Sequence, residues 1–555
     1  MKRFTEDEIQ DLTDRVFLIT EKLDAGELKI AAHLADGFRA SLEAIRLQPD
    51  GRVDPATVDG RIRAMSLAIR GMSQREDAKK AVSLAKIQTM YFDFLFKQFG
   101  SFYKQMTKAK ANPEQMSRAL AKDPDFCKQL QDGFPELSTI IHEFWNSVGD
   151  SATYHLQDST QLKAAFAGDL FPAHWENAVS TAGLYVDTII LPCPFSRIAP
   201  LEKVMAPKEL AAVLMKHVLT AMTYRELATA DVEPPLVLIA PDPNDLGQEN
   251  KIVLAQNSES LTCKHAEYLF GRPFESLANL AEFCGDLKTV DQVLSELKGR
   301  DRLIFDSEWG RDPKIQLERA MKAPAHQMLH EGVAGNTVLT ACAGRMPQAF
   351  ATQANSRRVG GTPLICADTS WLYYTWMLEY EGAPVIGDRQ ARQTMHVTRA
   401  LTSEIGNNLE WLGNIPPETV LEIRKQGLAE EVRSILGNGI TELVGINPNN
   451  YFRTADQVID NLERAFREHQ RTLSEAKQRK LKLYGIDVPT CLAVGGVAVA
   501  AALMGSPALG VASGLLGAVG LPNLKDIRSK FTAIADEDRL RKISPTGLLF
   551  RHSLR

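Results

Sequence analysis

The sequence predicts a mainly α protein with a central α/β region, built on a short, mostly parallel sheet, and a C-terminal Gly/Ala-rich apolar helical hairpin. Apolar residues recur every three or four positions through residues 1–180, and short apolar runs replace this period in 181–395. The helical period returns in 396–487 and ends in a long basic helix. An uncharged stretch, 488–524, and a basic tail, 525–555, complete the chain.

The composition is that of a folded protein kept in a reducing compartment. Of 555 residues, 44% are hydrophobic and 24% are charged, which is too apolar for a disordered chain. The chain is also too long for one hydrophobic core. The seven cysteines are dispersed without a CxxC pair, so neither a disulfide framework nor a zinc ribbon is expected. The N-terminus has no apolar core typical of a signal peptide, and we expect a cytoplasmic protein.

Charge is distributed unevenly along the chain. Residues 453–555 carry 16 Lys and Arg against 10 Asp and Glu, although the whole chain has a net charge of −5. A basic C-terminal part on an acidic body favours contact with an anionic surface, such as lipid headgroups, and less so with nucleic acid. The alternative is a solvated helix face.

The first 180 residues show helix signals. Thr5 and Glu8 form a capping-box pattern, and Gly26 marks the expected end of the first helix. The aromatic-rich segments 81–106 and 136–148 keep the helical period with wide apolar faces, which is typical of core helices in a bundle.

The central region alternates short apolar runs with helix-like segments such as 209–227, which predicts parallel strands connected by helices. The segment 370–380, SWLYYTWMLEY, is interpreted as a helix buried on most sides rather than a base-stacking surface, because few Lys or Arg lie near it. The expected strands lie in 185–194, 234–243, 301–309, 336–344, 362–370 and 382–388.

Helices return after the central region. Pro417 stands where a helix can start, and Gly437 lies near its expected end. Thr454 and Gln457 form a second capping-box pattern, after which about thirty residues can form one basic helix roughly 45 Å long.

The uncharged stretch 488–524 favours a hairpin. The GSPA turn at 505–508 divides it into two arms, and basic residues on both sides favour placing both ends on one face of a membrane. Small residues permit close helix contact within or between chains. A membrane-engaging hairpin, a hairpin buried in a soluble domain and a mobile insert all remain open. The assembly residues are Gly495, Gly496, Ala498, Ala502, Pro507, Gly510, Gly514 and Gly517, and the basic flank is Lys477, Arg479, Lys480, Lys482, Lys525, Arg528 and Lys530.

An acidic residue follows four of the apolar runs. If those runs were neighbouring parallel strands, the carboxylates would gather at the sheet edge where α/β proteins bind ligands. Oxygen ligands suit Mg²⁺ and metal-assisted phosphodiester hydrolysis. The alternative is that aspartate starts turns and caps helices, in which case no cofactor is expected. The four residues are Asp242, Asp306, Asp368 and Asp388.

Two functions therefore remain open. The long basic helix, Gly/Ala hairpin and basic tail in 453–555 resemble the plan of bacterial membrane-acting effectors, including those of antiviral defence and toxin systems. This resemblance implies an interaction protein that is cytoplasmic or attached to the inner membrane through 488–524, with a protein partner, its own copies or an anionic membrane as the target. The alternative is a metal-dependent nuclease or phosphohydrolase that uses the strand-end aspartates.

A charge placed in the apolar stretch tests the membrane hairpin. Ala501→Arg should move the protein from the membrane fraction to the soluble fraction, because a central arginine costs about 2.5–3.5 kcal/mol on insertion. Gly514→Leu should leave the protein membrane-bound but less assembled, because it blocks close helix contact. Wild-type protein that is entirely soluble, together with lost folding stability in both variants, would indicate a buried hairpin instead.

Overall fold

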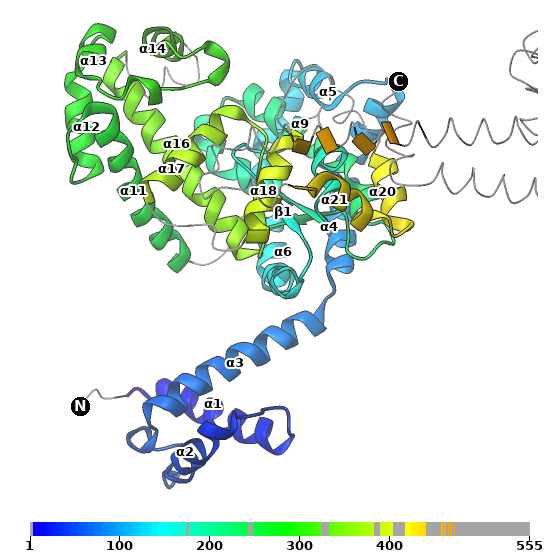
Figure 1. Ribbon diagram of the computed structural model, residues 1–555, viewed down its shortest axis with the longest axis vertical. Helices are drawn as coiled ribbons and strands as arrows, with labels where there is room; N and C mark the ends of the chain where they lie inside the picture. Colours follow the sequence, from blue (N-terminus) through cyan, green and yellow to red (C-terminus); the bar gives the residue numbers. More distant parts are fainter. Residues whose placement is uncertain are drawn as a thin grey trace, which may run out of the picture. The chain divides into compact units, whose positions relative to one another are not determined.

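The structure is a computed structural model, and its described residues fall into two compact units (Figure 1). One unit combines residues 1–91 with 139–159, and the other combines 92–138 with 160–555. The division falls inside two long helices, α4 (Leu84–Lys108) and α6 (Pro124–Asp158). The structure describes residues 4–173, 177–241, 248–322, 332–381, 389–402, 417–439 and single positions or pairs between 457 and 471.

The first unit is built from α1 (Glu6–Asp24), α2 (Ala32–Glu43), α3 (Gly60–Ala81) and the adjoining parts of α4 and α6. The predicted capping box is confirmed: the Thr5 hydroxyl accepts the Glu8 amide, and the Glu8 carboxylate accepts the Thr5 amide. The predicted end is also confirmed, since Gly26 follows α1 with a φ of +69°. The core of the first unit includes Leu12, Val16, Ile19, Phe38 and Ile62.

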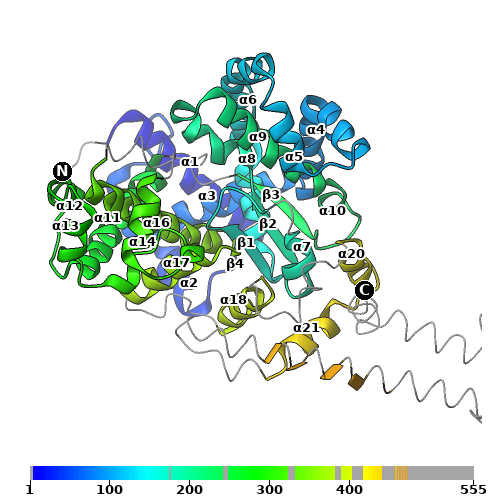
Figure 2. The ribbon, with the colours of Figure 1, turned by 90° about the horizontal axis from the view of Figure 1, so that it is seen from above.

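The second unit holds a four-stranded parallel sheet and most of the helices (Figure 2). Its remaining elements are α5 (Pro113–Leu120), β1 (Lys163–Ala167), α7 (Ala178–Thr181), η2 (Ala182–Leu184), β2 (Thr188–Pro192), α8 (Pro194–Ile198), η3 (Ala199–Val204), α9 (Pro207–Thr223), α10 (Arg225–Ala228), β3 (Val237–Ala240), α11 (Gln248–Phe270), α12 (Leu277–Asp286), α13 (Val290–Glu296), η5 (Arg300–Arg302), η6 (Ser307–Trp309), α14 (Pro313–Lys322), α16 (Ala334–Arg358), β4 (Thr362–Ile365), α17 (Asp368–Glu381), α18 (Arg389–Thr402), α20 (Pro417–Lys425) and α21 (Ala429–Gly437).

The strands lie in the order β3-β2-β1-β4, and every pair is parallel. The register places Ala164 opposite both Ile189 and Thr362. All residues of the four strands are buried, which explains why the predicted runs were nearly uninterrupted in apolar character. The mostly parallel sheet is therefore confirmed, with β2, β3 and β4 inside predicted strand segments.

The central strand β1 was missed, because it lies within residues 1–180, which were predicted to be helical. Its sequence, KAAFA, is dominated by alanine, a strong helix former, and sheet pairing on both sides overrides that preference. The boundary at residue 181 between a helical and an α/β domain stays a prediction.

Two predicted strands are wrong. Residues 336–344 lie inside the helix α16, where Ala334, Val338 and Cys342 recur at helical spacing on a buried face. In residues 301–309, the backbone of Phe305 bonds to a side chain rather than to a neighbouring strand. Its amide donates to Gln316 Oε1 at 2.7 Å, and Leu303–Phe305 pack among helices.

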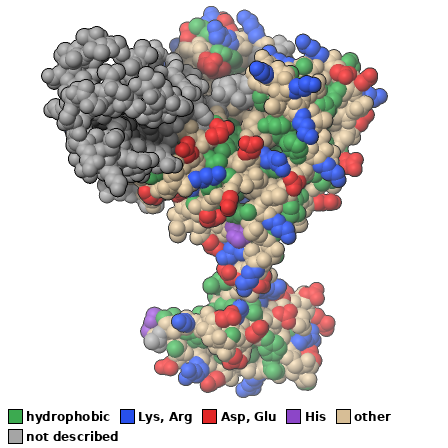
Figure 3. Space-filling view, turned by 90° about the vertical axis from the view of Figure 1, so that its right-hand side faces the viewer, with side chains coloured by type: hydrophobic (Ala, Val, Ile, Leu, Met, Phe, Trp, Pro, Cys, Tyr) green, Lys and Arg blue, Asp and Glu red, His purple; other side chains and the backbone are tan. Residues whose placement is uncertain are grey.

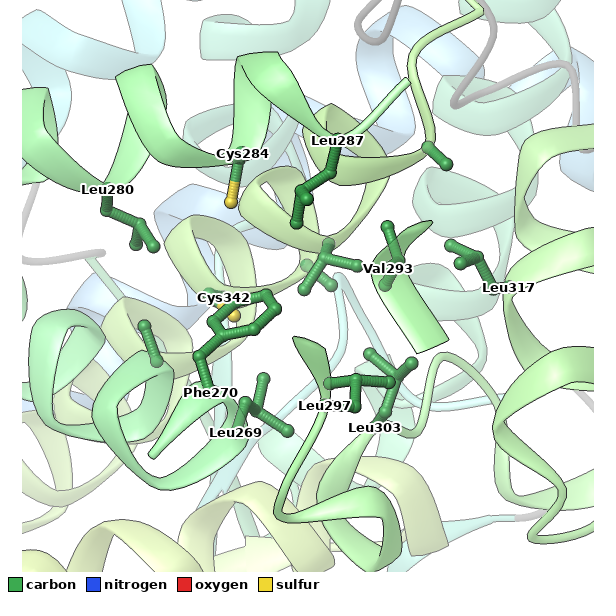
Figure 4. Packing of buried hydrophobic residues seen from close by; sticks show 14 of the residues in the cluster. Leu269, Phe270, Leu280, Cys284, Leu287, Val293, Leu297, Leu303, Leu317 and Cys342 are labelled. Carbon is green, nitrogen blue, oxygen red and sulfur yellow. The ribbon is translucent and has the colours of Figure 1, made fainter. Parts of the chain in front are cut away.

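The chain between β3 and β4 forms a helical cluster with its own core (Figure 4). Helix α16 contacts α11, α12, α14 and α17 and also reaches the sheet at β1 and β4. Cys284 and Cys342 point into this core, and burial raises the pKa of the Cys284 thiol to about 12. We assign these thiols to packing.

The aromatic segment 370–380 is core, as predicted. Trp371, Tyr373, Tyr374 and Trp376 are buried in α17. The Tyr373 hydroxyl donates to Ile304 O at 2.8 Å, and the Tyr374 hydroxyl donates to Gln353 Oε1. Each buried hydroxyl therefore has a partner.

Helix α20 begins at Pro417 and α21 ends at Gly437, as predicted, with a break at Gly427 between them. The second capping box at Thr454, the apolar stretch 488–524, its assembly glycines and both basic flanks lie outside the described residues. Among the residues that the structure describes, no helix combines the length and the apolar character needed to cross a bilayer.

Three buried histidines make the stability of the second unit depend on pH. Burial lowers the pKa of His217 and His396 to about 4, and burial together with the nearby Arg302 lowers that of His265 to about 3. The unfolded chain binds protons below about pH 6.5, whereas the folded protein does not until about pH 4. The free energy of unfolding should therefore fall as pH drops from 6.5 towards 4, by about 2 kcal/mol per histidine at pH 5.

His217→Gln removes one of these groups. Urea unfolding at pH 7 and pH 5 should show a smaller loss of stability in the variant than in the wild type. Equal losses in both proteins would mean that His217 is already protonated in the folded state at pH 5.

Candidate functional site

The strand order places a switch point between β1 and β4. From β1 the chain continues outward to β2 and β3, and it then returns to place β4 on the other side of β1. In open parallel sheets, ligands bind outside the carboxyl ends of the strands where the order reverses in this way. The residues that follow β1 and β4 are therefore the candidate site.

The loops after these two strands approach each other closely. Gly168 follows β1 with a φ of +84°, and a Cβ there would lie 2.8 Å from Ser370 Cβ. Its carbonyl oxygen accepts hydrogen bonds from Ser370 Oγ at 2.6 Å and from Gln348 Nε2 at 3.0 Å. The first turn of α17 and the middle of α16 are thus fixed against the end of β1.

A buried arginine lies at the end of β4. Arg399, on α18, is 2% exposed and donates to Ile365 O at 3.2 Å and to Cys366 O at 2.9 Å. It also pairs with the Asp368 carboxylate at the start of α17, and its guanidinium lies 5.1 Å from the centre of the Trp371 ring. The protein thereby fixes a full positive charge under the carboxyl edge.

A second arginine reaches the same loops from α16. The guanidinium of Arg345 lies 3.2 Å from Gln348 Oε1 and 3.5 Å from both Ser370 Oγ and Phe305 O. Hydrogen bonds of 3.5 Å are weak. In the part of the chain that the structure describes, Arg345 is partly buried and makes no ion pair.

The structure describes two of the four predicted aspartates, Asp306 and Asp368. Asp242 and Asp388 lie outside the described residues, and Asp306 follows no strand. Asp306 Oδ1 accepts the Glu308 amide at 2.9 Å, as a capping residue does. The strands before Asp242 and Asp368 are β3 and β4, which lie at opposite edges of the sheet rather than side by side. Within the described ranges, no group of three or more possible metal ligands occurs.

One part of the predicted convergence does occur. Ser307, next to Asp306, bonds to Thr369, next to Asp368: the Ser307 amide and hydroxyl lie 2.9 and 3.0 Å from Thr369 Oγ1. The two aspartates therefore stand on adjoining loops. Sequence reasoning missed Arg345 and Arg399, since a single arginine in an amphipathic helix gives no signal of a site.

A second charged cluster lies at the amino edge of the sheet, where the carboxylate of Asp187 is shared by two arginines. Arg424 on α20 and Arg433 on α21 lie 2.5 and 2.6 Å from Asp187 Oδ1. Asp187 Oδ2 accepts the amide of Leu162, just before β1, at 2.9 Å. Although burial opposes ionisation, this amide and the two arginines lower the pKa of Asp187 below its usual range. This group is called the Asp187 clamp below.

No protein-family model, curated protein or solved structure matches the chain. Function therefore has to be inferred from the two charged edges of the sheet. The carboxyl edge offers two guanidinium groups and the hydroxyls of Ser307 and Thr369, which together suit a small anion rather than a cation.

The close approach at Gly168 can be tested by substitution. Gly168→Ala should lower the free energy of unfolding by more than Gly427→Ala does, as measured by chemical denaturation. Both positions have positive φ, which costs an alanine about 1–2 kcal/mol, but only the Gly168 Cβ meets a neighbour within 4 Å. The clash with Ser370 should add about 1–3 kcal/mol. Equal losses would mean that the two loops separate readily.

Proposed function

We propose that the protein is a non-enzymatic interaction protein, an effector whose C-terminal apolar stretch 488–524 engages a membrane or assembles with other copies. The α/β body would hold the start of this C-terminal segment and control its availability. The observation that carries the proposal is the Asp187 clamp, because it attaches α20 and α21, which precede that segment in the chain, to the sheet.

The clamp is strong enough for such a role. The side chains of Asp187, Arg424 and Arg433 are at most 14% exposed. Arg424 also donates to Pro234 O at 3.1 Å, and Arg433 donates to Tyr185 O at 2.8 Å. Removing one partner from a buried ion pair typically costs 3–5 kcal/mol, about as much as a conformational switch needs.

The attachment continues beyond α21. Asn461 is 4% exposed, and its amide donates to Leu436 O at 3.2 Å and to Asn438 O at 2.7 Å. These bonds tie Asn461, which lies within the segment predicted to form the basic helix, to the end of α21. A change at the clamp would therefore reach the chain that leads to residues 488–524.

The charges on one described face favour a protein partner more than nucleic acid. On the face in Figure 3, the coloured Lys and Arg side chains are interspersed with Asp and Glu. A nucleic-acid groove usually concentrates positive charge along one stripe.

One observation favours the alternative, a metal-dependent nuclease or phosphohydrolase. The Ser307–Thr369 bonds bring the loops of Asp306 and Asp368 together, which is the placement that a Mg²⁺ site would need. Against it, Asp368 is already paired with Arg399.

Opening the clamp should release the C-terminal segment. We expect Asp187→Asn to raise the fraction of protein that is membrane-bound or assembled, measured by fractionation and by size-exclusion chromatography with light scattering. The matched control is Glu430→Gln, which removes the 82% exposed carboxylate that also contacts Arg433 and should change little.

Asp187→Asn in a chain that lacks residues 488–524 distinguishes release of the C-terminal segment from misfolding of the rest of the protein. That protein should remain soluble and monomeric. If it aggregates as much as full-length Asp187→Asn, or if the full-length variant behaves like wild type, the clamp does not control the C-terminal segment.

A further inference from the structure

The two arginines at the carboxyl edge differ in how their charges are balanced. Arg399 is 2% exposed, whereas the side chain of its partner, Asp368, is 62% exposed. The carboxylate thus lies on the solvent side of a buried guanidinium, where an oxygen of a bound anion could replace it. An exposed partner is bound weakly enough to exchange, because solvent screens the pair.

Arg345 supplies a charge without a described counter-ion at the same edge. Its contacts at 3.2–3.5 Å, to Gln348, Ser370 and Phe305, include no carboxylate. Ser370, whose Oγ lies 3.5 Å from Arg345, and Asp368, which pairs with Arg399, both belong to the first turn of α17. A guanidinium without a carboxylate partner is typical of oxyanion sites.

We propose that the switch point between β1 and β4 binds a soluble, phosphate-bearing small molecule through Arg345 and Arg399, with Asp368 as the internal competitor. Two guanidinium groups match a dianion better than a single carboxylate. The hydroxyls of Ser307 and Thr369, 3.0 Å apart, follow Asp306 and Asp368 in the sequence and can supply one further donor. The site also lies where the topology of the sheet predicts ligand binding.

Two acids near this edge accept backbone amides. Asp169 is exposed, and its carboxylate accepts its neighbour's amide, Leu170 N, at 2.6 Å. Asp306 accepts the Glu308 amide. Asp368 pairs with the buried Arg399, so a bound anion would compete with the Asp368 carboxylate. This binding does not depend on the proposed release of the C-terminal segment.

The test measures binding of inorganic pyrophosphate to the full chain by isothermal titration calorimetry at constant ionic strength, without divalent cations. Wild type should bind, and Arg345→Gln should weaken binding by at least about tenfold. Asp368→Asn should strengthen binding by up to about fivefold, because it removes the competitor. Arg118→Gln, which changes a 74% exposed arginine on α5, should bind like wild type.

The Asp368 variant also separates this proposal from the metal site. A Mg²⁺ site would make pyrophosphate binding require the cation, and Asp368→Asn would then weaken it. Arg399→Gln should abolish binding in a protein whose circular dichroism is unchanged. If Arg399→Gln unfolds, pyrophosphate binding by Arg345→Gln and Asp368→Asn still tests the proposal. Pyrophosphate binding that is absent at millimolar concentration, or unchanged by Arg345→Gln, would overturn the proposal.

Discussion

The carboxylate of Asp187 is the interaction on which most of the second unit depends. It accepts the amide that precedes β1, stands one residue before β2, and binds arginines from α20 and α21. A single charged group therefore joins the starts of the two central strands and fixes α20 and α21 to them. A hydrophobic residue at this position could fill the same space, but it could not satisfy the Leu162 amide and two buried guanidinium groups together.

At the opposite edge, side chains from other elements satisfy the carbonyl groups that follow the strands. Gln348 and Ser370 bind Gly168 O after β1, and Arg399 binds Ile365 O and Cys366 O after β4. Strands of four or five residues leave many such groups beyond the ladder, and a buried carbonyl needs a partner. Arg399 of the candidate site therefore serves the fold as well as any ligand.

Sequence reasoning identified the elements whose patterns are local and missed those decided by distant contacts. The capping box at Thr5, the start of α20 at Pro417 and the apolar strands β2, β3 and β4 were all predictable. β1 was not, because alanine favours helix and only its two neighbours make it a strand. The segment 303–305 has the composition of a strand, but Gln316 bonds to its backbone in place of a neighbouring strand. The arginines of the site gave no sequence signal, because their importance comes from what they contact.

The first unit is formed by two separate segments of the chain, so neither unit can be cut out as one continuous fragment without part of the other. Its second segment supplies Trp145, which lies 5.4 Å from Tyr91 between ring centres, and Asp158, which pairs with Arg75. A fragment that stops at residue 91 would leave these surfaces uncovered, and one that continues to 159 would carry residues 92–138 of the other unit with it. No single break in the gene separates the two units, so recombination at one point cannot transfer either of them intact. The two units are therefore expected to be inherited together, whatever becomes of the C-terminal segment.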